Sequence, residues 1–130
     1  MSGVRVSTDG WPLVLVTLPA AQSDDEVLAY FDELRACRAR REPYAIVVDA
    51  AASRGFSAKQ RRMQAQYVSE GLELSGMYLK GLAFIAPSEL IRGMLTAIFW
   101  LQRPASPHRV FTTKEEAVAW ARERVEGRRA

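Results

Sequence analysis

The side chains best spaced for chemistry follow one apolar segment of the chain. Tyr44–Val48 is a continuous apolar run that ends at Asp49, and a loop of small residues leads from there to Ser57. The carboxyl end of a buried parallel strand is where α/β folds place their sites. An acid there can act as a general base, a metal ligand or an acceptor for loop amides. Since no second carboxylate, histidine or cysteine lies nearby in the sequence, we expect Asp49 to fix the loop by hydrogen bonds.

The other reactive side chains do not complete a catalytic or metal site. His108 is the only histidine, and no nucleophile motif places a serine or cysteine to be activated by it. Cys37 is the only cysteine, so it has no disulfide partner, and its surroundings lack metal-ligand spacing. Ser53–Ser57 lacks the glycine pair and lysine of a phosphate-binding loop. We therefore expect a protein that is not an enzyme and that uses no cofactor and no metal.

Length and charge exclude several classes of protein. The 130 residues suffice for a single domain, residues 1–130, that buries roughly two-thirds of its unfolded surface. The net charge of +3 is mild and its arginines are spread over several segments, which argues against nucleic-acid binding. The apolar runs are too short to span a bilayer, and Met1–Arg5 lacks the features of a secretory signal. We expect a cytoplasmic protein with no membrane span.

Apolar runs and helix-start signals alternate along the chain. Strands are predicted at Val4–Val6, Leu13–Leu18, Tyr44–Val48, Leu79–Ala86 and Arg109–Phe111. Helices are predicted from Ser23 to the Arg38–Arg41 region, from Ser57 to a stop at Gly76, from Ser88 to Leu101, and from Thr113 through Val125, with capping boxes at Ser23, Ser57 and Thr113. Gly127–Ala130 is expected to fray. The order ββαβαβαβα predicts a single-domain α/β fold, with a mostly parallel sheet, an N-terminal hairpin and helices packed on the sheet.

This order, the passage from Val47 to Ser57 and the ending Val110–Trp120 together resemble the STAS-like family, the relatives of sulfate-transporter and anti-sigma-factor-antagonist domains. The ending, a Val-Phe pair followed by a capping Thr, Glu-Glu-Ala and Trp, is especially similar to the stand-alone bacterial branch. The resemblance covers nearly the whole chain in element order. It implies a STAS-like fold and a regulatory or scaffolding role in bacterial signalling, with a protein partner.

The resemblance also implies a place for phosphorylation. In the antagonist members, a partner kinase phosphorylates a serine at the start of the helix after the central strand, and its state decides which protein is bound. Ser53 or Ser57 corresponds to that serine here, although three alanines follow Asp49 where the family has paired serines and a glycine. Ser57 is already explained as a helix N-cap, so Ser53 is the better acceptor. A phosphate at either would meet the positive end of the helix dipole.

The loop and the helix start after it are the predicted partner-binding surface. We expect contacts from Asp49, Arg54, Phe56, Lys59 and Arg62, with Phe56 as an apolar contact in a basic rim. The same cations would also suit an ordinary solvated helix face.

The helix from Ser88 to Leu101 is apolar over more of its circumference than one sheet contact needs. A neighbouring helix, a second subunit or an apolar ligand would each cover the remainder. For the second subunit, the predicted homodimer surface is Leu95, Phe99 and Trp100. For the ligand, the alternative function is binding of a small apolar or lipid-like molecule in a cavity lined by Met94, Ile98 and Leu82.

Overall fold

The computed structural model describes residues 3–127, and residues 128–130 of the end predicted to fray lie outside them. In chain order the elements are β1 (Arg5–Ser7), β2 (Leu13–Thr17), α1 (Asp24–Arg38), β3 (Tyr44–Asp49), α2 (Ala58–Glu70), α3 (Leu72–Tyr78), β4 (Leu79–Ile85), α4 (Glu89–Leu101), β5 (His108–Phe111) and α5 (Lys114–Glu126). The predicted alternation of strands and helices is confirmed, with one helix more than expected.

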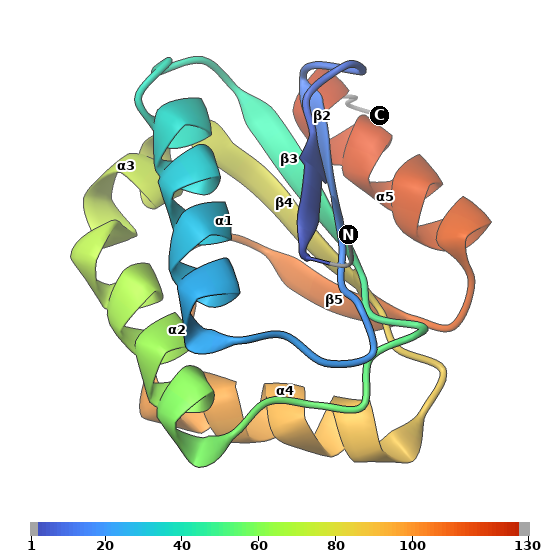
Figure 1. Ribbon diagram of the computed structural model, residues 1–130. Coiled ribbons are helices and arrows are strands. Elements are labelled where there is room, and N and C mark those ends of the chain that lie inside the picture. Colours follow the sequence, from blue (N-terminus) through green and yellow to red (C-terminus); the bar gives the residue numbers. More distant parts are fainter. Residues whose placement is uncertain (1–2, 128–130) are drawn as a thin grey trace.

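The strands form one sheet in the order β1-β2-β3-β4-β5 (Figure 1). β1 pairs antiparallel with β2, which confirms the N-terminal hairpin, and the other neighbours pair in parallel. β3 is the central strand, and its first four residues are buried, as its unbroken apolar run predicts. The carboxyl ends of β2, β3 and β4 therefore share one edge of the sheet.

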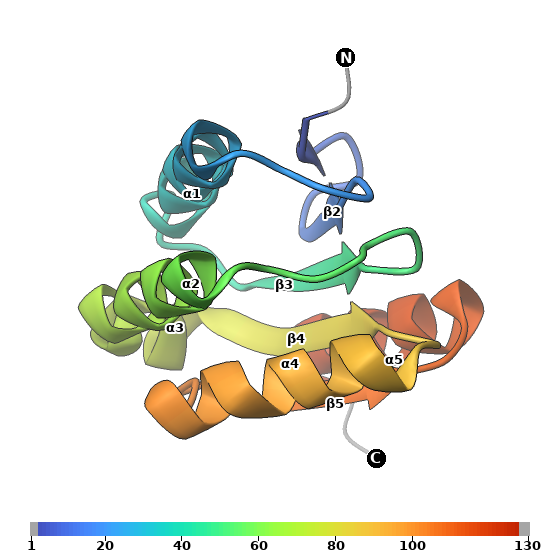
Figure 2. The ribbon, with the colours of Figure 1, turned by 60° about the horizontal axis from the view of Figure 1, so that its bottom comes forward.

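Helices cover both faces of the sheet, because alternate side chains of each strand point to opposite sides. On β3, Ala45 and Val47 pack in the smaller core with Ala117 and Ala121 of α5. Ile46 belongs to the larger core, which α1 and α4 also enter. Figure 2 shows α5 on one side of the sheet and the other helices opposite it. This larger core holds most of the bulky side chains.

The helix predicted from Ser57 to Gly76 is in fact two helices. α2 ends at Gly71, which has φ −114° and ψ 17°, and α3 begins at Leu72 and runs past Gly76 to Tyr78. The glycine at this junction has a tertiary reason, since a Cβ atom at Gly71 would overlap the guanidinium of Arg38 from α1. Gly76 is therefore an interior helix residue and not the stop.

Ser23, Ser57, Ser88 and Thr113 are all helix N-caps as predicted, and two of the three predicted capping boxes are complete. Ser23 and Ser57 form complete capping boxes with Glu26 and Gln60. Thr113 accepts a hydrogen bond from the backbone N–H of Glu116, but the reciprocal half of the box is not formed. Each cap satisfies one of the orphan N–H groups of its helix.

Candidate functional site

The loop between β3 and α2 lies at the carboxyl edge of the sheet and is fixed by hydrogen bonds. Asp49 Oδ1 accepts from the backbone N–H of Ala51 at 3.0 Å, which confirms the loop-fixing bond predicted for this acid. The N–H of Ala50 donates to Ile85 of β4, and the N–H of Arg54 donates to Ala20, both at 2.9 Å. The loop therefore has a defined shape set by its neighbours on both sides.

The end of the loop is seated on α4. The backbone N–H of Phe56 lies 3.3 Å from Met94 Sδ and donates to it. Gly55 has φ +115°, and a Cβ atom there would come within 2.5 Å of the Met94 sulfur. The Phe56 ring is buried in the larger core, so it is not exposed as the apolar partner contact that the sequence predicts.

The two candidate serines differ in access. Ser53 is buried, and its Oγ accepts from the backbone N–H of Gly55 at 3.0 Å. Ser57 is exposed, and its Oγ accepts from the N–H of Gln60 at 3.0 Å as the N-cap of α2. A kinase would reach Ser57 without opening the loop, which reverses the preference for Ser53 drawn from the sequence.

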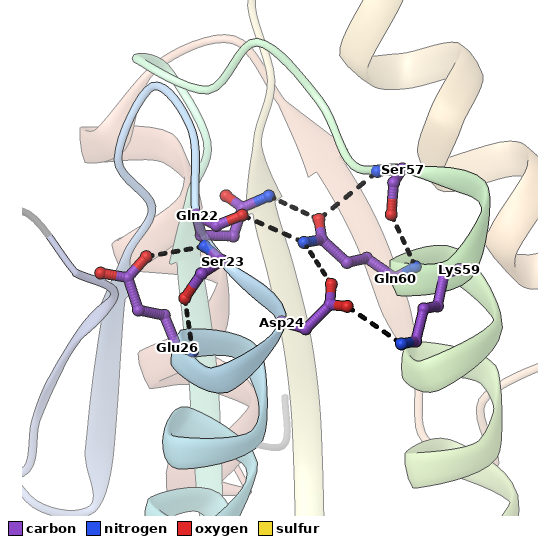
Figure 3. A network of polar contacts seen from close by, with 7 residues as sticks. All are labelled: Gln22, Ser23, Asp24, Glu26, Ser57, Lys59 and Gln60. Atoms are coloured by element: carbon purple, nitrogen blue, oxygen red, sulfur yellow. Dashed lines mark hydrogen bonds and ion pairs between the residues drawn. The ribbon is translucent and has the colours of Figure 1, made fainter.

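A polar network joins the first turns of α1 and α2 (Figure 3). Gln60, which is buried, donates through Nε2 to the carbonyl of Gln22 and to Asp24 Oδ1, both at 3.0 Å. Its Oε1 accepts from Gln22 Nε2 at 2.8 Å and from the N–H of Ser57 at 3.4 Å. Gln22 Nε2 also donates to the carbonyl of Gly55 at 3.2 Å. The network therefore couples the positions of two helix starts and the loop.

Charge in this network sits on Asp24 and Lys59, whose Oδ2 and Nζ are 3.1 Å apart. The hydrogen bond from Gln60, followed by the interaction with Lys59, lowers the pKa of Asp24 below its ordinary value of 3.8. Both side chains reach solvent, so the ion pair itself contributes little to stability.

The predicted basic rim is divided between two neighbours of α2. Lys59 leans toward α1, where it meets Asp24, whereas Arg62 borders a shallow groove with Leu101 and Gln102 at the end of α4. Arg54 and Arg62 are exposed, and neither forms an ion pair within residues 3–127. Arg54 and Arg62 are thus the rim cations with the most freedom to meet an acidic surface.

The three residues of the predicted dimer surface do not share one face of α4. Leu95 is buried in the larger core, and the Phe99 ring packs 5.6 Å from Phe84 and 4.7 Å from His108 between centroids. Only Trp100 points outward, with 86% of its surface exposed. The large apolar residues of α4 that are exposed are Leu90, Trp100 and Leu101.

An apolar cavity of about 90 Å³ lies between the sheet and the helices α1, α2 and α4. Leu82 and Ile98 line it as predicted; Met94 does not border it, whereas Phe56 does. Two pairs of its polar wall groups are hydrogen-bonded to each other: Tyr30 Oη donates to Gln64 and Ser106 Oγ donates to the carbonyl of Ser75, both at 3.0 Å. Burial raises the pKa of Tyr30, so its phenol stays neutral as a donor.

Asp49 and His108, which offered the only basis for an enzyme, are not brought together. Asp49 is in register with Ile85 of β4, and His108 is in register with Leu82. Asp49 and His108 are therefore separated by the intervening strand β4 and by about 10 Å, three residues, in the strand direction. Cys37 is buried in the core, and burial raises the pKa of its thiol. Among the described residues no group of three or more His, Cys, Asp or Glu side chains is placed to hold a metal.

Sequence reasoning missed two of the residues that shape the site. Gln60 was recognised only as a capping residue, although its hydrogen bonds to Gln22 and Asp24 connect two helices. The sequence predicts Met94 at the cavity, whereas its sulfur accepts the hydrogen bond that holds the loop. The local sequence signals neither contact, because both join segments more than 30 residues apart.

Two solved structures have a similar fold. One is an uncharacterized protein of the DUF3478 family with a SpoIIAA-like fold, from Shewanella loihica PV-4. It has a TM-score of 0.65 and 18% identity, over 93% of this chain and 95% of that one. The other is an anti-sigma factor antagonist from Mycobacterium paratuberculosis, with a TM-score of 0.61 and 16% identity, over 94% of this chain and 95% of that one. No protein-family model and no curated protein matches the chain. In residues 3–127, none of the helices is long and apolar enough to cross a membrane.

Proposed function

We propose that this chain, which has a STAS-like fold, is a non-enzymatic regulatory module that binds a protein partner through the loop after β3 and the first turns of α2. The observation that carries the proposal is a loop of fixed shape that, with the start of α2, presents the exposed cations Arg54 and Arg62, neither of which forms an ion pair with a residue that the structure describes. The structural similarity to an anti-sigma factor antagonist supports a role of this kind. The partner surface is expected to be acidic, because Arg54 and Arg62 would then gain charged hydrogen bonds.

The proposed contacts follow the exposure of the side chains. Arg54, Lys59 and Arg62 offer cations, and the Asp49 carboxylate, half-buried, shapes the loop that presents them. Phe56 does not contact the partner in this proposal; its buried ring anchors the loop to the larger core. We place the protein in the bacterial cytoplasm as a signalling component, in keeping with this proposal.

Phosphorylation of Ser57 is the proposed modulation. A phosphate there would add negative charge at the N-terminus of α2, where the helix dipole favours it, and within reach of the first-turn residue Lys59. Lys59 now pairs with Asp24, so a phosphate would compete for that cation and change the charge of the rim. Ser53 would require the loop to open first, because its hydroxyl is buried.

The test is capture of partners from the native host with matched variants. We expect Arg54→Glu/Arg62→Glu to lose a partner that the wild type retains. Arg122→Glu, an exposed site on α5 at the opposite face, should keep that partner while making a change of the same kind. Equal capture by all three proteins would refute the surface. Ser57→Asp, which preserves an N-cap acceptor, should shift partner choice if the charge matters.

A second candidate function is favoured by the cavity. An apolar space of about 90 Å³, bordered by Phe56 and Ile98, would take a small apolar molecule. Native mass spectrometry of the protein from its host would show such a molecule as a mass adduct.

The homodimer remains a prediction, and on this structure it would depend on Leu90, Trp100 and Leu101 of α4. Trp100→Glu should abolish a dimer seen by light scattering. A dimer that survives this substitution would place the interface elsewhere.

A further inference from the structure

α4 has an apolar outer face. The helix lies along the lower edge of the molecule in Figure 1, and its buried side chains turn into the larger core. On its outer side Trp100 has 86% of its surface exposed, Leu90 has 58% and Leu101 has 56%. Large apolar side chains gathered on one exposed helix face mark an interaction surface, because a lone domain gains nothing from holding them in water.

Two small residues lie in the middle of this face. Gly93 and Ala97 are exposed and follow Leu90 by three and seven residues, the spacing of one helix face. A Cβ atom at Gly93 would meet nothing within 4 Å, so the fold of one chain gives no steric reason for glycine there. Glycine inside a helix is destabilising relative to alanine. The close approach of another helix would explain a residue without a side chain at this point.

The face has the same order of large and small residues when it is read from either end. Leu90 and Trp100 lie five residues before and after Leu95, and Gly93 and Ala97 lie two residues before and after it. Two antiparallel α4 helices with a two-fold axis at the level of Leu95 therefore place Leu90 opposite Trp100, and Gly93 opposite Ala97. Crossing helices are closest at the crossing point, so small residues suit the middle and large ones the ends.

The charges at the two ends of α4 favour this arrangement. Glu89 is the first residue of the helix and Arg103 lies two residues past its end; both are exposed, and neither forms an ion pair with a described residue. Arg92, the only charged residue between them, donates to the carbonyls of Ala86 and Pro87. Antiparallel copies bring Glu89 of one chain beside Arg103 of the other, whereas parallel copies would bring like charges together. The opposed helix dipoles also favour the antiparallel pair.

A groove beside α4 widens the contact. Arg62, Ala65, Gln66 and Ser69 of α2 border it together with Leu101 and Gln102. In the antiparallel pair, Leu90 of the second copy lies opposite Leu101, next to this groove. The contact therefore extends from α4, which alone spans only about 20 Å, onto the side of α2.

We propose that a second copy of this chain packs antiparallel on α4, with the two-fold axis at the level of Leu95. This inference rests on the homodimer proposed above and specifies its interface. The contacts between copies are Leu90 with Trp100, Gly93 with Ala97, and Glu89 with Arg103. Trp100 is the expected hot spot, because tryptophans buried near the centre of an interface contribute most to binding.

Sedimentation equilibrium of the full chain over a range of concentrations measures the dissociation constant of the dimer. Glu89→Arg and Arg103→Glu should each raise this constant at least about fivefold at low salt, because each puts two like-charge pairs into the antiparallel dimer. The double variant Glu89→Arg/Arg103→Glu should restore the wild-type constant, since it exchanges the charges of both pairs. A dissociation constant unchanged in both single variants would indicate a parallel dimer and overturn the proposed arrangement.

Gly93→Gln tests the close approach of the helices. The new side chain enters open space in one chain, so thermal unfolding at a concentration where the wild type is monomeric should show no loss of stability. The dissociation constant of the dimer should rise at least about tenfold, because the helices can no longer meet at the crossing point. Ala119→Gln is the matched control at an exposed position of α5, across the sheet, and should leave the constant unchanged (Figure 2).

The failures are distinguishable. A wild type that stays monomeric at every concentration would overturn both this inference and the homodimer. A dimer that neither Gly93→Gln nor the single charge reversals weaken would keep the homodimer and overturn this interface. The partner-binding proposal is tested with different variants and a different measurement, so it stands or fails separately.

Discussion

Replacing Gln60 by alanine is the sharpest test of how the site is held. The Gln60 side chain makes hydrogen bonds to the carbonyl and Nε2 of Gln22, to Asp24 and to the N–H of Ser57. A net contribution of about 1 kcal/mol for each bond gives about 4 kcal/mol as an upper value. Asp24 and Ser57 reach solvent and would recover water, so we expect a loss of about 2–3 kcal/mol.

The measurement is urea unfolding at neutral pH. With a slope of about 1–3 kcal/mol/M, the loss should lower the midpoint by roughly 0.7–3 M and leave the slope unchanged. Gln66→Ala is the matched control, because Gln66 is an exposed glutamine of the same helix and its removal should change stability by less than about 0.5 kcal/mol. Gln60→Glu should also destabilise, because it replaces the Nε2 donor with an acceptor facing Asp24. If Gln60→Ala lowered the free energy of unfolding no more than Gln66→Ala does, the network would contribute nothing to stability and the reasoning would be wrong.

Three further outcomes are expected. Folding lowers the pKa of Asp24, so the Asp24 carboxylate stabilises the fold above pH about 4, and this stabilisation is lost as the pH falls through the lower folded pKa. Asp24→Asn should therefore flatten this part of the curve of unfolding free energy against pH, measured by urea unfolding. Gly55→Ala should lower the free energy of unfolding by about 2–3 kcal/mol, because φ +115° is strained for alanine and its Cβ meets Met94; a change below 0.5 kcal/mol in urea would contradict this. In thermal unfolding, Leu95→Ala should lower the free energy of unfolding by about 2–5 kcal/mol and Trp100→Ala by less than about 0.5 kcal/mol, because only Leu95 is buried. Equal losses would mean that the two faces of α4 are wrongly placed.

Features with a local cause could be predicted from the sequence. The strand Tyr44–Asp49 ends at the acid that fixes the loop, and the bond from Asp49 Oδ1 to Ala51 spans two residues. The Ser23 and Ser57 caps likewise depend on a partner three residues away. Where the determining contact lies within one turn, residue type and spacing are enough to anticipate it.

Features whose cause lies far away in the sequence could not be predicted from it. Gly71 makes room for Arg38, more than 30 residues earlier, and no local signal marks the junction there, so the run from Ser57 to Gly76 reads as one helix. Phe56 follows a loop of small residues and reads as exposed, yet the fold turns its ring into the core. For Leu95, Phe99 and Trp100, apolarity does not say which face meets the sheet, because apolar residues cover more of the helix than one sheet contact needs.

The loop connects the two proposed sites. Phe56 borders the cavity, while Arg54 and Ser57 on either side of it face the proposed partner. A ligand in the cavity would press on Phe56 and on its bond to Met94, and hence on the segment that presents the cations. Any change in partner affinity caused by the ligand must equal the change in ligand affinity caused by the partner. Partner binding measured with and without a small apolar molecule, such as butan-1-ol, would test this coupling, and identical affinities would mean that the loop transmits nothing between the sites.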